Sequence, residues 1–160
     1  MKRQHWLILF GILTAAVMTF IFTQSMLSKE DSSQQSAVWF ALLKPILDPQ
    51  NKYSDELLHN FVRKMAHFAE FGALGVCVGG FTTNLGRLHG KRYVSLPMLI
   101  TLATAVCDEF IQYFFERGSM VTDVVLDYSG ALTGLLTVAA FVCLQKRFAS
   151  KKGERNHDPL

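Results

Sequence analysis

The sequence predicts an all-α integral membrane protein with four transmembrane helices and a short interfacial helix in the first external loop. Half of the 160 residues are apolar, 18% are charged, and the mean hydropathy is positive. A helix needs about 20 apolar residues to cross a bilayer core. Four stretches reach that length: 6–26, 61–83, 94–115 and 121–145. We therefore expect a single membrane domain over residues 6–145, followed by a basic cytoplasmic tail over residues 146–160.

The first apolar stretch, Trp6–Met26, has no charged residue and is the clearest predicted span. Lys2 and Arg3 in front of it are also typical of a secretory signal peptide. The apolar run is too long for a signal peptide, however, and it ends in Thr23-Gln24-Ser25 rather than in an Ala-x-Ala cleavage site. We interpret it as an uncleaved first span.

The segment between the first two spans, residues 27–59, is the predicted external loop. It opens with a polar linker, Asp31–Ser36, and continues with Ala37–Leu43, which is too short to span a bilayer. The second segment suits an interfacial helix that ends at Pro45, and a buried loop turn is the alternative on length alone. Ser54 or Asp55 is the expected N-cap of the following helix.

Lysine and arginine residues gather on one side of the predicted bundle. They are Lys2, Arg3, Arg87, Lys91, Arg92, Lys146, Arg147, Lys151, Lys152 and Arg155. Because positive residues are retained on the cytoplasmic side, both termini are expected in the cytoplasm. This topology, together with attraction to anionic lipid, explains the basic tail, so no nucleic-acid partner is expected.

Ionisable residues interrupt the last three apolar stretches, always at the end away from the cytoplasm. They are Arg63, Lys64, His67 and Glu70 in the second span, Asp108 and Glu109 with Gln112 in the third, and Asp123 and Asp127 in the fourth. Such groups are costly at membrane depth and are retained mainly when they are paired, face a wet cavity or are functional. We therefore expect one polar cavity open to the outer face. Its expected residues are His67, Glu109, Arg117, Asp123 and Asp127.

The same residues allow two other interpretations. Carboxylates this close cannot all stay ionised in a low dielectric without partners, so they could form a structural ion-pair network with Arg63, Lys64, His67 and Arg117. A metal site built from His67, Glu70, Glu109, Asp123 and Asp127 is the third interpretation. A single histidine among carboxylates favours no particular metal, so neither a metal nor another cofactor is expected.

Glycines at four-residue spacing occur in the second and fourth spans, as Gly75 with Gly79 and Gly130 with Gly134. Small residues at this spacing allow two helices to approach closely in lipid, which makes both pairs candidate packing seams. The alternative is that they are ordinary glycines of membrane helices, where glycine is frequent.

Several motifs follow one another in order: Arg63-Lys-Met-Ala-His-Phe-Ala-Glu-Phe-Gly-Ala-Leu-Gly75, Asp108-Glu-Phe-Ile-Gln112, then Arg117, and Asp123 with Asp127 before Gly130 and Gly134. Over roughly residues 25–144 this order closely resembles the VanZ-like family of membrane proteins. The positions that match the family pattern are Lys64, His67, Glu109, Gln112, Arg117, Asp123, Asp127, Gly130 and Gly134. The chain departs from that pattern at Glu70, and at Asp127, where Asn is frequent. Both differences add a carboxylate to the cluster of ionisable residues.

The resemblance implies a bacterial cell-envelope protein of the cytoplasmic membrane, linked to teicoplanin-type glycopeptide resistance without change to the peptidoglycan precursor. The implied partner is a membrane lipid or a lipid-linked envelope component, with the glycopeptide antibiotic as a further candidate. Its oligomeric state is left open. The further candidates for ligand binding are Lys64, Gln112, Arg63 and Glu70.

Two functional classes fit this setting. The first is a non-catalytic module that binds an envelope component or alters the outer leaflet. The second is an enzyme acting on a lipid-linked cell-wall intermediate, with His67 as general base, Glu109 as its partner, and Lys64 with Arg117 binding a phosphate. No nucleophile stands beside a base and no familiar catalytic motif occurs, which favours the first class.

Overall fold

The chain folds into five α-helices, as seen in a computed structural model that describes residues 3–27, 29–115 and 120–155. In chain order they are α1 (Arg3–Ser25), α2 (Lys29–Leu47), α3 (Asp55–His89), α4 (Ser95–Phe114) and α5 (Val121–Arg155). The described residues include no strand. The predicted all-α class is therefore confirmed.

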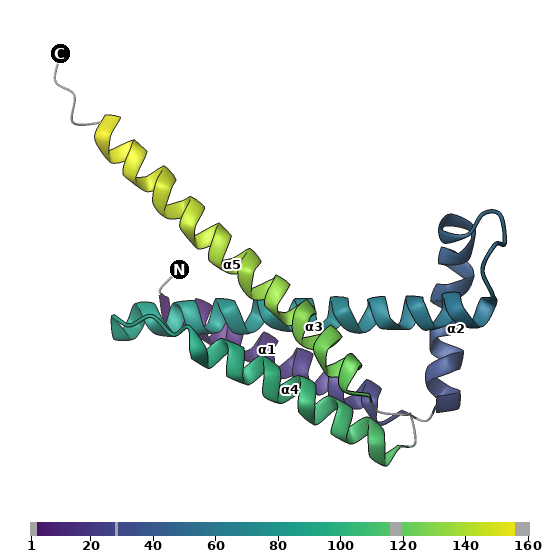
Figure 1. The fold of residues 1–160 in the computed structure, drawn as a ribbon. Helices are drawn as coiled ribbons and strands as arrows, with labels where there is room; N and C mark the ends of the chain where they lie inside the picture. Colours follow the sequence, from purple (N-terminus) through teal and green to yellow (C-terminus); the bar gives the residue numbers. More distant parts are fainter. Residues whose placement is uncertain (1–2, 28, 116–119, 156–160) are drawn as a thin grey trace.

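α3 is the central helix, and it contacts each of the other four. α1 and α4 lie along it, α5 crosses it obliquely, and α2 stands across its start (Figure 1). α1, α3, α4 and α5 alternate in direction along the bundle. The ends of α1 and α4 therefore lie near the first half of α3 and the start of α5, at one end of the bundle (Figure 1).

α3 begins and ends at residues suited to helix termini. Ser54 is the N-cap, and its side-chain oxygen accepts a hydrogen bond from the Leu57 N–H at 3.4 Å, which confirms one of the two predicted caps. At the other end Gly90 adopts a left-handed conformation, with φ of 63°, which glycine tolerates without strain. The helix is 35 residues long, so it extends the predicted stretch 61–83 at both ends.

α2 differs from the prediction for the external loop. The helix already starts at Lys29, so the expected linker Asp31–Ser36 is helical, and Pro45 lies inside the helix rather than ending it. Pro45 has no N–H to donate within the helix, and α2 ends two residues later at Leu47. A 2.7 Å ion pair between Lys44 and Asp55 ties this last turn to the start of α3. An interfacial position for α2 stays a prediction.

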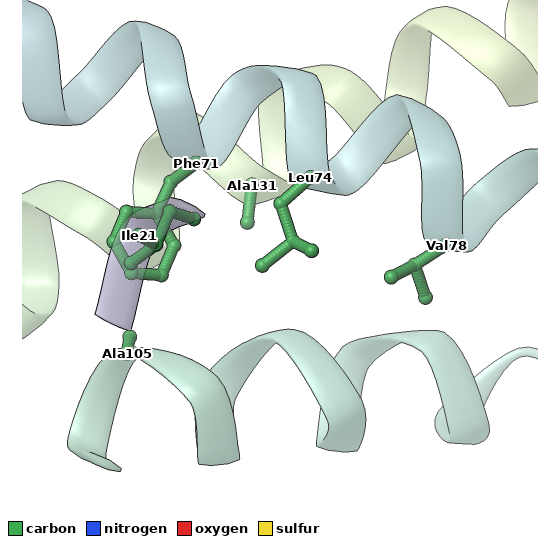
Figure 2. Packing of buried hydrophobic residues seen from close by; sticks show 6 residues of the cluster. All are labelled: Ile21, Phe71, Leu74, Val78, Ala105 and Ala131. Atoms are coloured by element: carbon green, nitrogen blue, oxygen red, sulfur yellow. The ribbon is translucent and has the colours of Figure 1, made fainter. Parts of the chain in front are cut away.

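The apolar core is small and is shared by four helices. Its buried residues are Ile21, Phe71, Leu74, Val78, Ala105 and Ala131, which face one another between α1, α3, α4 and α5 (Figure 2). Because Ile21 is fully buried in this core, the first predicted span packs as part of the domain.

Polar residues are buried while large apolar residues face outward, the reverse of the usual arrangement in water. Asp108 and Asp127 are 0% and 1% exposed, whereas Ile12 on α1 is 62% exposed and Leu136 on α5 is 69% exposed. Extensive apolar surface is an aggregation liability in water but suits a lipid environment. This distribution favours a membrane protein.

Two helical segments, Gln4–Ser25 and Val121–Ser150, are long and apolar enough to cross a membrane by length and composition. α3 and α4 are not among these candidate segments, and both carry buried polar side chains, such as Asn84 on α3 and Asp108 on α4. Passage of these two helices through the membrane therefore stays a prediction. α5 continues beyond Gln145 to Arg155, so the predicted basic tail begins as an extension of this helix.

α3 and α5 cross with their backbones in contact. The glycines at the crossing are Gly75, Gly130 and Gly134, where an added Cβ would overlap the carbonyl oxygens of Ala131, Phe68 and Gly72, in that order. Gly79 has slightly more room, since its Cβ would lie 3.2 Å from a side-chain carbon of Val138. All four glycines singled out by their spacing thus lie between these two helices, which only small residues allow to come so close.

Candidate functional site

A polar hollow lies where α3, α4 and α5 meet near the start of α5. It has an open mouth, and its cavity volume is about 10 Å³, room for about one water molecule. It is lined by Arg63, Lys64 and His67 from α3, Glu109 and Gln112 from α4, and Asp123, Leu126 and Asp127 from α5. The structure therefore gathers around one hollow most of the ionisable residues that the sequence places at this end of the bundle.

Helix periodicity explains which side chains reach the hollow. Residues three or four apart share a helix face. His67 follows Arg63 by one turn on α3, and Asp127 follows Asp123 by one turn on α5. Because α4 buries the face that carries Glu109, this side chain meets the other two helices inside the bundle.

The mouth of the hollow is closed on one side by an ion pair between α3 and α5. The Lys64 ammonium lies 2.5 Å from the Asp123 carboxylate, and the two side chains are 39% and 18% exposed. At this exposure an ion pair contributes about 0–1 kcal/mol to stability. Its main effect is to hold the two helices in register at this end.

Glu109 connects α4 to the start of α5. Its carboxylate accepts a hydrogen bond from the Met120 backbone N–H at 3.1 Å, directly before α5 begins at Val121. Negative charge is favourable at a helix N-terminus, because the first N–H groups have no partner within the helix. Glu109 is thus oriented by the start of the neighbouring helix.

Asp108 lies beneath the hollow and is fully buried. One carboxylate oxygen accepts a hydrogen bond from the Ser25 hydroxyl on α1, and the other accepts one from the Gln112 amide at 2.7 Å. Both bonds fix the orientation of the carboxylate. The bond from Ser25 also joins the end of α1 to the end of α4.

Asp127 is also buried, but its environment is different. Neither of its carboxylate oxygens has a hydrogen-bond partner among the residues that the structure describes. Its carboxylate lies close to His67 and Asp108, and one ligand-type atom from each of the three side chains lies within 4.8 Å of the others. A buried carboxylate without a compensating partner is costly, so this part of the site is suited to receive one.

Two predicted residues, Arg117 and Glu70, have a different outcome. Arg117 lies outside the described residues, and Glu70 is not among the described residues that line the hollow. Sequence reasoning missed Ser25, and it placed Asp108 in the cluster without assigning it to the site. The four-residue spacing of Asp108 and Gln112 is a usable signal, whereas a lone serine at the end of an apolar helix gives none.

A family model for VanZ/LLP1 proteins matches residues 10–142. The chain belongs to the VanZ/LLP1 family. The match extends from α1 to α5 and includes every residue that lines the hollow, which confirms the family predicted from the motifs. No curated protein and no solved structure matches the chain significantly. The chemistry of this VanZ/LLP1 protein must therefore be argued from its own residues.

Proposed function

We propose that this VanZ/LLP1 protein is a four-span protein of the bacterial cytoplasmic membrane that gives resistance to teicoplanin-type glycopeptides. It binds a membrane lipid or lipid-linked envelope component in the polar hollow, or alters the outer leaflet around it. The observation that carries the proposal is that ionisable side chains from three helices line one hollow at one end of an otherwise apolar bundle.

The hollow opens to the outer face in this proposal. The N-terminus, the connection between α3 and α4, and the end of α5 lie toward the other end of the bundle (Figure 1). These three segments carry the lysines and arginines that mark the cytoplasmic side. Passage of all four helices through the membrane gives both termini the same, cytoplasmic, location.

Cysteine labelling tests this topology. In a chain whose native cysteines are replaced, Val121→Cys lies near the hollow and Arg92→Cys lies between α3 and α4, and both positions are exposed. An impermeant thiol reagent added to intact cells should label Val121→Cys, and should reach Arg92→Cys only after permeabilisation. The reverse pattern would overturn the proposed orientation.

Two basic side chains that line the hollow, Arg63 and Lys64, suit an anionic headgroup. Arg63 offers a planar guanidinium fork that matches the geometry of phosphate. Lys64 has three N–H donors, of which the ion pair with Asp123 uses one. A phosphate at the mouth can therefore bind both side chains while the helices stay joined. Charge-assisted hydrogen bonds of this kind are stronger than neutral ones.

Teicoplanin susceptibility tests the function. A susceptible host expressing the wild type should be protected, whereas hosts expressing His67→Ala or Glu109→Gln at the same membrane level should not be. Glu56→Gln is the matched control, because Glu56 is exposed on α3 and does not line the hollow. A functional role for the hollow would be overturned if hosts expressing either hollow variant were still protected from teicoplanin. It would also be overturned if loss of protection always accompanied loss of the protein from the membrane.

A second candidate is a membrane enzyme that acts on a lipid or lipid-linked cell-wall intermediate. It is favoured by the position of His67, whose ring lies with two carboxylates beside the basic mouth of the hollow. Such a histidine can transfer protons near neutral pH. Lipid extracts from cells expressing the wild type and His67→Ala distinguish the candidates, since turnover requires a lipid product that only the wild type forms.

A further inference from the structure

We propose that His67, Asp108 and Asp127 form a binding site for one divalent transition-metal ion, either Mn²⁺ or Zn²⁺. The three side chains come from α3, α4 and α5, and each offers one ligand atom within 4.8 Å of the other two. The site lies at the inner side of the polar hollow, which His67 and Asp127 line. The proposal does not depend on the resistance function.

Asp127 gives the strongest indication of a missing cation. Its side chain is almost fully buried, it faces the hollow, and no described residue donates a hydrogen bond to either oxygen. Buried polar groups are nearly always partnered. Lys64, the ammonium in the same hollow, is bound to Asp123. A metal ion in front of Asp127 would supply the positive charge and the bond that its carboxylate lacks.

Two hydrogen bonds orient the Asp108 carboxylate, as is common for carboxylates that bind a metal ion. The Ser25 hydroxyl and the Gln112 amide donate to its two oxygens and fix the plane of the carboxylate. Each carboxylate oxygen has a second lone pair, so these bonds leave room for coordination. Hydrogen bonds of this kind from outside the ligand set orient the ligands and are a regular part of metal sites.

The geometry requires only a small closure. In a tetrahedral site, ligand atoms bound at about 2.1 Å to one ion lie about 3.4 Å apart, so atoms that lie within 4.8 Å of one another must approach by at most about 1.4 Å. One imidazole with two carboxylates is a mixed nitrogen and oxygen set. Imidazole suits zinc, carboxylates suit manganese, and magnesium or calcium prefers oxygen ligands alone. Three protein ligands leave positions that open into the hollow for water or an anionic ligand.

Metal binding to the purified protein tests the proposal. The full chain in detergent, stripped with a chelator, should bind one Mn²⁺ or Zn²⁺ per chain in equilibrium dialysis. Asp127→Asn and His67→Ala should each weaken binding by at least about 100-fold, since even residues outside the ligand set affect affinity by 10–100-fold. Glu56→Gln removes an exposed carboxylate of α3 that does not line the hollow, and should weaken binding by less than about tenfold.

The melting temperature with and without added metal provides a second test of the site. Adding the metal should raise the melting temperature of the wild type and of Glu56→Gln, but not that of Asp127→Asn or His67→Ala. If Asp127→Asn does not fold, the result for His67→Ala decides. Absence of stoichiometric binding to the wild type, or wild-type affinity in the triad variants that fold, would overturn the metal site. Neither result changes the expectation for teicoplanin susceptibility.

Discussion

The two halves of α3 meet the same neighbour, α5, in opposite ways. The polar half, residues 55–67, meets α5 through long side chains, with the ion pair of Lys64 and Asp123 at the contact. The glycine half, residues 68–89, meets α5 through backbone atoms at glycines such as Gly75. The contrast teaches that a hollow can form where long side chains hold α3 and α5 apart. The glycine crossing a few turns away holds the same two helices together.

The largest effect is expected in the glycine half. Gly75→Leu places a side chain where the Ala131 carbonyl oxygen lies, and backbone cannot move aside as a flexible side chain can. Overpacking of a well-packed site costs about 1–3 kcal/mol or more, and we expect at least about 3 kcal/mol of lost stability here. Denaturant unfolding in detergent and the level of protein in the membrane both measure it.

Gly11→Ala is the matched control for this substitution. The added Cβ on α1 lies 3.5 Å from the Phe81 ring, an ordinary van der Waals distance. Since alanine favours a helix over glycine by about 1 kcal/mol, stability should stay equal or rise slightly. Equal stability of Gly75→Leu and the wild type would show that the backbones of α3 and α5 do not touch as described.

A smaller loss of stability is expected from a substitution at Ser25, the last residue of α1. Ser25→Ala removes one donor to the buried Asp108 carboxylate, which should cost about 1–3 kcal/mol. Thr19→Ala on the same helix removes an exposed hydroxyl that bonds only to the Ala15 carbonyl, and should change stability by no more than about 0.5 kcal/mol. Thermal unfolding compares the two, and similar losses would mean that Asp108 does not rely on Ser25.

The ion pair at the mouth should matter less for stability than for function. A double-mutant cycle with Lys64→Gln and Asp123→Asn should give a coupling of about 0.2–1 kcal/mol, because both side chains are partly exposed. Lys64→Gln should nevertheless reduce teicoplanin protection if the hollow binds an anion. A coupling of several kcal/mol, with protection unchanged, would instead support the structural ion-pair network.

The smallest loss of stability is expected from a substitution at Asp48, in the turn that precedes the polar half of α3. The Tyr53 and Lys52 backbone N–H groups donate to the Asp48 carboxylate at 2.9 and 2.8 Å, and they hold its pKa below the usual value of 3.8. A lowered pKa stabilises the fold fully above pH 3.8, and this contribution is lost as the pH falls through the lower, folded-state value.

The melting temperature of wild type and Asp48→Asn should therefore differ most near neutral pH. The difference should shrink as the solution is acidified below the usual aspartate pKa. A difference that does not change with pH would show that the charge of Asp48 plays no part in the turn. A larger effect than that of Ser25→Ala would contradict the order proposed between the two regions.

The positions of α1, α4 and α5, and the gathering of residues around the hollow, were within reach of the sequence. In apolar helices an ionisable residue has few acceptable places, so the helical period and a shared end are enough to bring His67, Glu109 and Asp127 together. The glycine spacing identified the two helix surfaces that pack closely, because only small residues permit such an approach, but it did not show that they pack against each other.

Other features depend on tertiary contacts that leave no periodic signal. Ser25 is important because Asp108 reaches it from a distant helix, and nothing in its neighbourhood distinguishes it from other serines. The start of α2 was placed too late because serine and glutamine are neutral in helices and typical of linkers. The absence of a metal was expected because a single histidine is a weak signal. Only the buried and unpartnered carboxylate of Asp127 changes that interpretation.

The hydrogen bond between Ser25 and Asp108 joins residues that are 83 positions apart, and the ion pair of Lys64 and Asp123 also spans two helices. In both pairs the donor comes first in the chain. Because synthesis proceeds from the N-terminus, each donor is made before the acid that it will bind. A nascent chain synthesised only to the end of α3 contains Ser25 and Lys64 but neither Asp108 nor Asp123. The direction of translation thus makes each donor available before the carboxylate that it binds.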